Sequence, residues 1–162
     1  MYRKPSASKI VYIALAWSIG LTASYGNACT ISKDMEDSLP LNSIDIPNSD
    51  RLKIVDMVME ARRWPDAEIR GIVYAGGYVM ENDPWALAEQ RASELRAYLI
   101  QLGVNERNIW VDKRTINRPD VDSKGNKTLN QIAVTLVPIC EGGCERLCND
   151  SRVTPNSKAI TK

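Results

Sequence analysis

The chain has 162 residues and is nearly neutral, with 21 lysines and arginines, 20 aspartates and glutamates and no histidine. The lack of histidine excludes Ser-His and Cys-His catalysis as well as histidine-ligated metal sites. The balanced charge and the lack of a basic run argue against a nucleic-acid-binding protein.

Residues 1–28 have the pattern of a secretory signal peptide. A basic start precedes an apolar run over 10–21, and small residues lead up to Ala28. An uncleaved membrane anchor is the competing interpretation, but a spanning helix needs about 20 apolar residues, and this run ends sooner. We therefore expect cleavage after Ala28 and an exported mature chain over 29–162, forming one domain without a transmembrane segment.

All four cysteines lie in the expected mature chain: Cys29, Cys140, Cys144 and Cys148. An even number of cysteines in an oxidising compartment predicts two disulfides, one of which joins Cys29 to a member of the cysteine cluster over 140–148. Two alternatives stay open. One is a four-cysteine zinc site, although zinc cysteines usually come in two C-x2–4-C pairs. The other is lipidation of Cys29, as in bacterial lipoproteins. We expect no metal and no cofactor.

The first part of the mature chain predicts a strand, a helix and a second strand. Residues 29–42 are polar and predict an irregular segment, whereas 43–47 alternates like a short edge strand. Ser49 is placed to cap a helix over 50–63. The apolar residues of this helix form one broad face: Ile54, Val55, Val58, Met59 and Ala61. Residues 67–74 follow as a strand whose consecutive apolar side chains predict a central place in the sheet.

The clearest element is a helix from Asp83 to Gly103. Its apolar residues recur at spacings of three and four, which places them on one stripe: Ala88, Ala92, Leu95, Leu99 and Leu102. Asp83 is a good N-cap, Pro84 suits the first helical position, and Gly103 can end the helix with a positive φ. We expect Leu95 and Leu99 to be buried against the sheet.

Two more strands are expected after this helix. The first covers 109–112, with Ile109 and Val111 pointing inward, and a polar loop over 115–129 follows it. The last strand covers 130–138 and alternates with a period of two, so that its apolar side chains share a face. The tail over 149–162 lacks periodicity and predicts disorder.

The predicted order of elements over 43–139 is β-α-β-α-β-β. This order favours an α/β fold of the α+β two-layer sandwich type, in which both helices pack on one face of a mixed sheet.

The main helix also carries a resemblance to a known family. The run Leu87-Ala88-Glu89-Gln90-Arg91-Ala92, followed by Leu95, Leu99 and Leu102-Gly103-Val104, is similar to the L-S-x-x-R-A segment and its continuation in OmpA-like domains. In that family the segment follows a strand and a glycine-containing turn, here 69–74 and Ala75-Gly76-Gly77. The resemblance implies the β-α-β-α-β-β architecture and a domain that associates with peptidoglycan.

The resemblance also implies a ligand site, of which this chain keeps only part. In OmpA-like domains the arginine of the R-A pair holds a carboxylate of a diaminopimelate stem peptide, and an aspartate in the preceding turn helps to fix the ligand. Arg91 matches the arginine, but Gly76 stands at the position of the aspartate. Glu81 and Asp83 are the nearby carboxylates that can substitute for it. The alternative for Arg91 is an ordinary charge pair on the helix surface, for example with Glu94.

These observations indicate an exported, non-catalytic envelope protein in the periplasm or at the periplasmic face of the outer membrane. Its expected partner is a peptidoglycan stem peptide or an envelope protein. The lost turn aspartate favours the alternative function, in which the fold has been diverted to protein recognition, as in a periplasmic inhibitor, an immunity protein or a subunit of a secretion apparatus.

Overall fold

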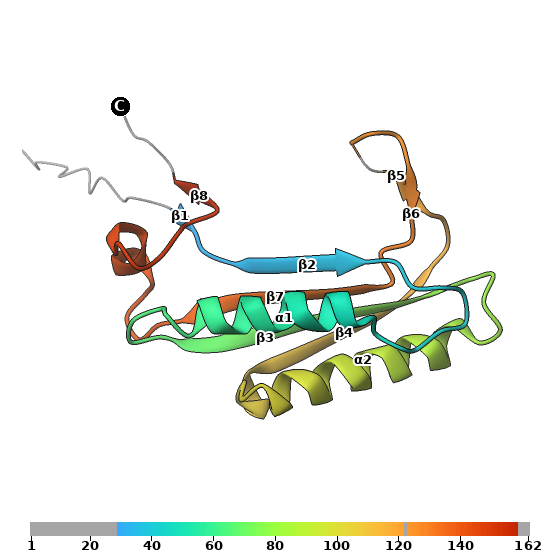
Figure 1. The fold of residues 1–162 in the computed structure, drawn as a ribbon, viewed down its shortest axis with the longest axis horizontal. Coiled ribbons are helices and arrows are strands. Elements are labelled where there is room, and N and C mark those ends of the chain that lie inside the picture. Colours follow the sequence, from blue (N-terminus) through green and yellow to red (C-terminus); the bar gives the residue numbers. More distant parts are fainter. Residues whose placement is uncertain (1–28, 122, 159–162) are drawn as a thin grey trace, which may run out of the picture.

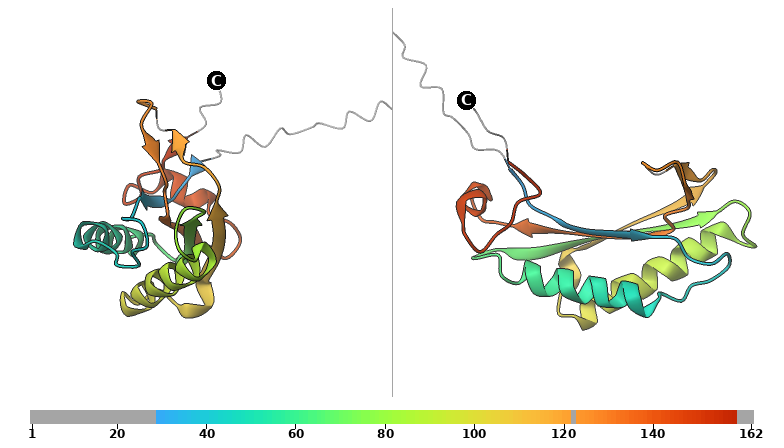
Figure 2. Two further views of the ribbon diagram at one scale, coloured as in Figure 1. Left: turned by 90° about the vertical axis from the view of Figure 1, so that its right-hand side faces the viewer. Right: turned by 45° about the horizontal axis from the view of Figure 1, so that its top comes forward.

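The computed structural model describes residues 29–121 and 123–158, so the expected signal peptide over 1–28 lies outside the described residues. Within them the main sheet has four strands, in the order β2 (Lys33–Asp37), β7 (Ile132–Ile139), β3 (Glu68–Tyr78) and β4 (Ile109–Ile116). β3 is parallel to β4 and antiparallel to β7, which is antiparallel to β2. Helices α1 (Asn48–Ala61) and α2 (Pro84–Gln101) both lie on one side of this sheet (Figures 1 and 2). The expected two-layer sandwich is confirmed.

Smaller elements lie at the two ends of the sheet. β1 (Cys29–Thr30) pairs with β8 (Ser157–Lys158), and β5 (Asp120–Val121) forms a short hairpin with β6 (Lys127–Thr128). Two 3-10 turns, η1 (Glu106–Asn108) and η2 (Glu145–Asn149), complete the chain. No helix among the described residues is long and apolar enough to span a membrane.

The apolar stripe of α2 forms the centre of the core, as its spacing predicts. Leu95 and Leu99 are completely buried against the sheet. Leu99 lies so close to β3 that a Cβ added at Gly71 would come within 3.0 Å of its Cδ1 atom. The predicted ends of the helix are also confirmed, because Asp83 accepts a hydrogen bond from the Ala86 N–H at 3.0 Å and Gly103 has a φ of +81°.

The first strand of the sheet is not where the sequence places it. β2 comes from the segment predicted to be irregular, whereas 43–47 forms no strand. β2 is an edge strand in which Met35 is the only buried residue, so its polar sequence carries almost no apolar alternation. In the segment over 43–47, Ile46 is buried in the core without strand pairing.

Three further expectations are wrong in detail. The first residue of α1 is Asn48, preceded by Pro47, and no side chain caps it, so Ser49 is not the N-cap. Met59 was expected to face inward but is 52% exposed, whereas Val111 pairs with Val73 and so lies on the helix-facing side of the sheet as expected, although it is 39% exposed. β3 continues through the glycines that were predicted to form a turn, because Gly76 and Gly77 pair with Arg114 and Thr115 of β4.

Two disulfides join the four cysteines, as expected. Cys29 is bonded to Cys148 across 119 positions, and Cys140 is bonded to Cys144. The bond at Cys29 leaves no thiol there for a lipid or for zinc. Residues 149–158 of the tail that was predicted to be disordered are ordered, because β8 pairs with β1 and Val153 is buried.

Candidate functional site

Arg91 lies on the buried stripe of α2 and not on its surface. It is one helical turn from Ala88 and Leu95, both of which face the sheet, and its own side chain is completely buried. The interpretation of Arg91 as part of a surface charge pair is therefore wrong. A buried guanidinium is costly unless every N–H donor has a partner, so the contacts of Arg91 decide what it can do.

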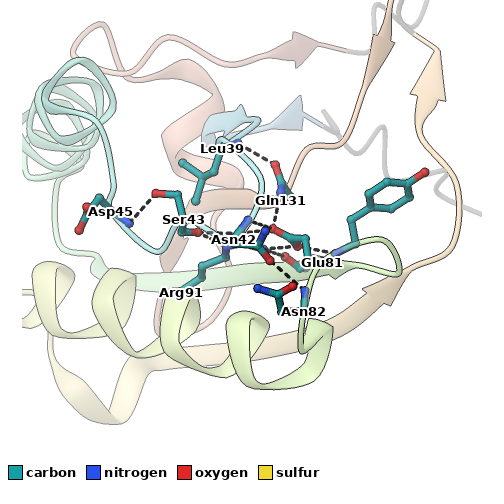
Figure 3. A network of polar contacts seen from close by, with 10 residues as sticks. Leu39, Asn42, Ser43, Asp45, Glu81, Asn82, Arg91 and Gln131 are labelled. Atoms are coloured by element: carbon teal, nitrogen blue, oxygen red, sulfur yellow. Dashed lines mark hydrogen bonds and ion pairs between the residues drawn. The ribbon is translucent and has the colours of Figure 1, made fainter.

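The five N–H donors of Arg91 are all occupied by acceptors within the chain (Figure 3). The Glu81 carboxylate accepts two hydrogen bonds from the guanidinium in a bidentate arrangement, at 2.6 Å from Nη2 to Oε1 and 2.9 Å from Nη1 to Oε2. The Ser43 carbonyl accepts from Nε at 2.9 Å and from Nη2 at 2.7 Å, and the Gly76 carbonyl accepts from Nη1 at 2.8 Å. The guanidinium thus ties together α2, the end of β3 and the segment before α1.

Glu81 is equally enclosed, with a side chain that has no exposed surface. Its carboxylate accepts hydrogen bonds from the backbone N–H groups of Asn42 and Tyr78, at 2.8 and 2.7 Å. Burial would by itself raise the pKa of Glu81. The hydrogen bonds from Arg91 and the two backbone N–H groups outweigh burial and lower this pKa to about 2. Glu81 is therefore ionised at every physiological pH.

Gln131 completes this network, and the sequence did not single it out as a site residue. It is fully buried, its Nε2 lies 3.3 Å from Glu81 Oε1, and its Oε1 accepts from the Leu39 N–H at 2.7 Å. The only signal in the sequence was a polar residue directly before an alternating apolar strand. Asp83, in contrast, is exposed and caps α2, and within the described residues it makes no hydrogen bond or ion pair with Arg91.

Comparison with known proteins shows similarity at the level of the fold. No protein-family model and no curated protein sequence matches the chain. The periplasmic domain of Helicobacter pylori MotB (residues 97–256) superposes with a TM-score of 0.50 at 16% identity, covering 68% of this chain and 83% of that one. The chain has an OmpA-like fold.

Two other solved structures show the same similarity at lower TM-scores. The OmpA-like domain of FopA1 from Francisella tularensis gives 0.45 at 16% identity, with 70% of this chain and 80% of that chain covered. A longer MotB periplasmic domain (residues 64–256) gives 0.49 at 18% identity. The alignment covers 64% of this chain and 60% of that MotB domain.

Neither glycine of the Gly76-Gly77 pair has open space for an aspartate side chain. An added Cβ at Gly77 would lie 1.7 Å from the backbone oxygen of Pro84, which cannot move aside, whereas one at Gly76 would lie 2.5 Å from the Cδ1 end of the flexible Ile116 side chain. The carboxylate facing Arg91 comes from Glu81 instead. The geometry therefore combines two of the three predicted site residues, Arg91 and Glu81, and leaves the guanidinium without a donor for a further ligand.

Proposed function

We propose that this chain is an exported, non-catalytic protein of the bacterial cell envelope whose OmpA-like domain recognises another envelope component. One observation decides between the possible components: every N–H donor of the Arg91 guanidinium is already hydrogen-bonded to Glu81, Ser43 or Gly76. An arginine in this state is a structural residue as long as its partners stay in place.

Peptidoglycan is the first candidate component. A stem-peptide carboxylate would have to displace the carboxylate of Glu81, which is held by two backbone N–H groups as well as by Arg91. Because each of these charge-assisted hydrogen bonds is stronger than a neutral one, the displacement is unfavourable. Peptidoglycan binding through Arg91 should therefore be weak.

A protein partner is the second candidate, and the occupied guanidinium favours it. The Arg91–Glu81 pair holds the loops around it in one arrangement without needing a ligand. The surface of the OmpA-like domain is then the part that makes contact with a partner, as in the inhibitor, immunity-protein or secretion-subunit functions.

Co-sedimentation with purified peptidoglycan tests the choice. The exported protein is compared with the Glu81→Gln variant, which keeps the shape of the side chain and removes its charge. If peptidoglycan binds at Arg91, the variant should sediment more strongly than the wild type, because a neutral amide competes less well for the guanidinium. If neither protein sediments while both keep their circular dichroism spectrum, peptidoglycan binding is refuted and the protein-partner function stands.

A further inference from the structure

Strand β4 forms one edge of the main sheet. Within the described residues it pairs only with β3, and it has eight residues, whereas β2 at the opposite edge has five. The outer side of an edge strand presents a row of backbone N–H and C=O groups with which another strand can pair. Trp110 and Val111 on β4 are also 54% and 39% exposed, although both are large and apolar. β4 therefore offers the backbone groups and the apolar surface that a further strand would cover.

The side chains of β4 alternate between the two faces of the sheet. Val111 pairs with Val73 and Lys113 pairs with Ala75, and both partners on β3 are buried on the helix side. The odd-numbered residues of β4 therefore lie on the helix side. The even-numbered residues lie on the face that points away from the helices: Trp110, Asp112, Arg114 and Ile116. In agreement with this, Asp112 and Arg114 form an ion pair at 2.5 Å.

Symmetry limits how a second copy of the chain could pair with this edge. An antiparallel pair of identical strands has a two-fold axis perpendicular to the sheet, which keeps the helices of both copies on the same side (Figure 2). Residues directly opposite each other share a face, so one residue at the axis faces its own copy. The longest overlaps pair 109–115 about Asp112 or 110–116 about Lys113.

The charges on β4 choose between these two registers. Centring on Asp112 places this carboxylate against its own copy, and like charges directly opposite each other are destabilising. Centring on Lys113 places Asp112 opposite Arg114 of the second copy, and the symmetry makes this ion pair twice. The two Lys113 side chains then face each other, but each ammonium is already paired with Glu89 of its own α2 at 2.8 Å. The register centred on Lys113 is therefore favoured.

The apolar residues agree with this register, and the other edge of the sheet lacks such complementarity. In the favoured register Trp110 lies opposite Ile116 of the second copy, and a cross-strand pair of an aromatic and a β-branched residue stabilises a sheet. At β2 the corresponding pairing about Met35 would place Asp34 opposite Glu36 twice. Self-pairing at β2 is thus repulsive, whereas β4 carries charges of both signs in a self-complementary order.

We propose that β4 is a self-association edge, through which two copies of the chain join their four-stranded sheets into one continuous sheet, with Lys113 at the two-fold axis. The contact uses the same strand of both copies, so it closes at a dimer and does not continue into a filament. The inference goes beyond the proposed function, because it involves neither Arg91 nor its partners and holds for either kind of envelope component.

Sedimentation velocity of the exported protein at increasing concentration tests the edge. The wild type should show a monomer–dimer equilibrium, and amide hydrogen exchange over 110–116 should slow as the dimer forms. Asp112→Arg turns two cross-strand ion pairs into like-charge pairs and should weaken dimerisation at least about tenfold. The charge swap Asp112→Arg/Arg114→Asp recreates the opposite pairs and should restore the dimer.

Asp56→Arg is the matched control, because it makes the same change of charge at an exposed position of α1. It should dimerise like the wild type. Circular dichroism spectra and melting temperatures at a concentration where the dimer is dissociated show whether each variant keeps its fold.

Three results would overturn the proposal. One is a wild type that stays monomeric up to the concentrations used for NMR. Another is a dimer that Asp112→Arg leaves intact, or one whose formation leaves amide exchange over 110–116 unchanged, because the copies would then meet through another surface. The third is a dimer that Asp112→Arg weakens and the charge swap does not restore. Co-sedimentation with peptidoglycan tests the proposed function separately from each of these results.

Discussion

Protonation of Glu81 should destabilise the fold in acid by an amount that the Arg91–Glu81 geometry sets. The pKa of Glu81 is about 2 in the folded protein against an ordinary value of 4.5. Because the folded-state pKa is the lower one, the stabilisation is fully present above about pH 5 and is lost as the pH falls through 4.5 toward 2. At 1.36 kcal/mol per pKa unit, the contribution is about 3 kcal/mol.

The assay is urea denaturation of the wild type and the Glu81→Gln variant between pH 7 and pH 2. Asp37 and Glu60 also have lowered pKa values, from hydrogen bonds that outweigh burial at Asp37 and from the Lys33 hydrogen bond at Glu60. Their effect is common to both proteins and cancels in the difference. The wild type should lose about 3 kcal/mol more than the variant on acidification, and at pH 7 the variant should be less stable by about 3–5 kcal/mol, as expected for breaking a buried ion pair. Parallel pH profiles for the two proteins would refute the assignment of Glu81 as a buried, ionised partner of Arg91.

Three further predictions concern the core, the disulfides and the glycine pair of β3. Leu99→Ala should lower the free energy of unfolding by about 2–5 kcal/mol, whereas Leu52→Ala, at a position that is 65% exposed, should change it by less than about 0.5 kcal/mol; equal effects in urea titrations would show that the α2 stripe is not the core. Replacing Cys29 and Cys148 together by serine should lower the free energy of unfolding by about 4–5 kcal/mol on the chain-entropy model. Replacing Cys140 and Cys144 together should lower it less, because that disulfide closes a much shorter loop. Thermal unfolding of the two double variants without reductant compares them. Gly77→Asp should abolish folding or displace the start of α2, because the new side chain meets backbone and not a flexible side chain; a variant with wild-type melting temperature would contradict this contact.

The sequence by itself determined the parts of the fold that depend on local periodicity and local capping. Leu95 and Leu99 could be placed in the core because a spacing of three and four defines one helix face whatever it packs against. The ends of α2 followed from Asp83 and Gly103 for the same reason, since an N-cap side chain and a positive φ act within one turn. The pairing of cysteines into two disulfides followed from their even number in a chain that the sequence predicts to be exported.

Tertiary structure alone decided the first strand and the chemistry of the site. β2 is held by hydrogen bonds to β7, nearly a hundred residues later in the chain, and a backbone pairing of this kind leaves no trace in a polar edge sequence. Arg91 has its partners in Ser43, before α1, and in Gly76 and Glu81, at the end of β3, and the fold brings these two segments to α2. An arginine that binds a ligand and an arginine that is satisfied within the chain have the same letter in the sequence, and only the acceptors around the guanidinium distinguish them.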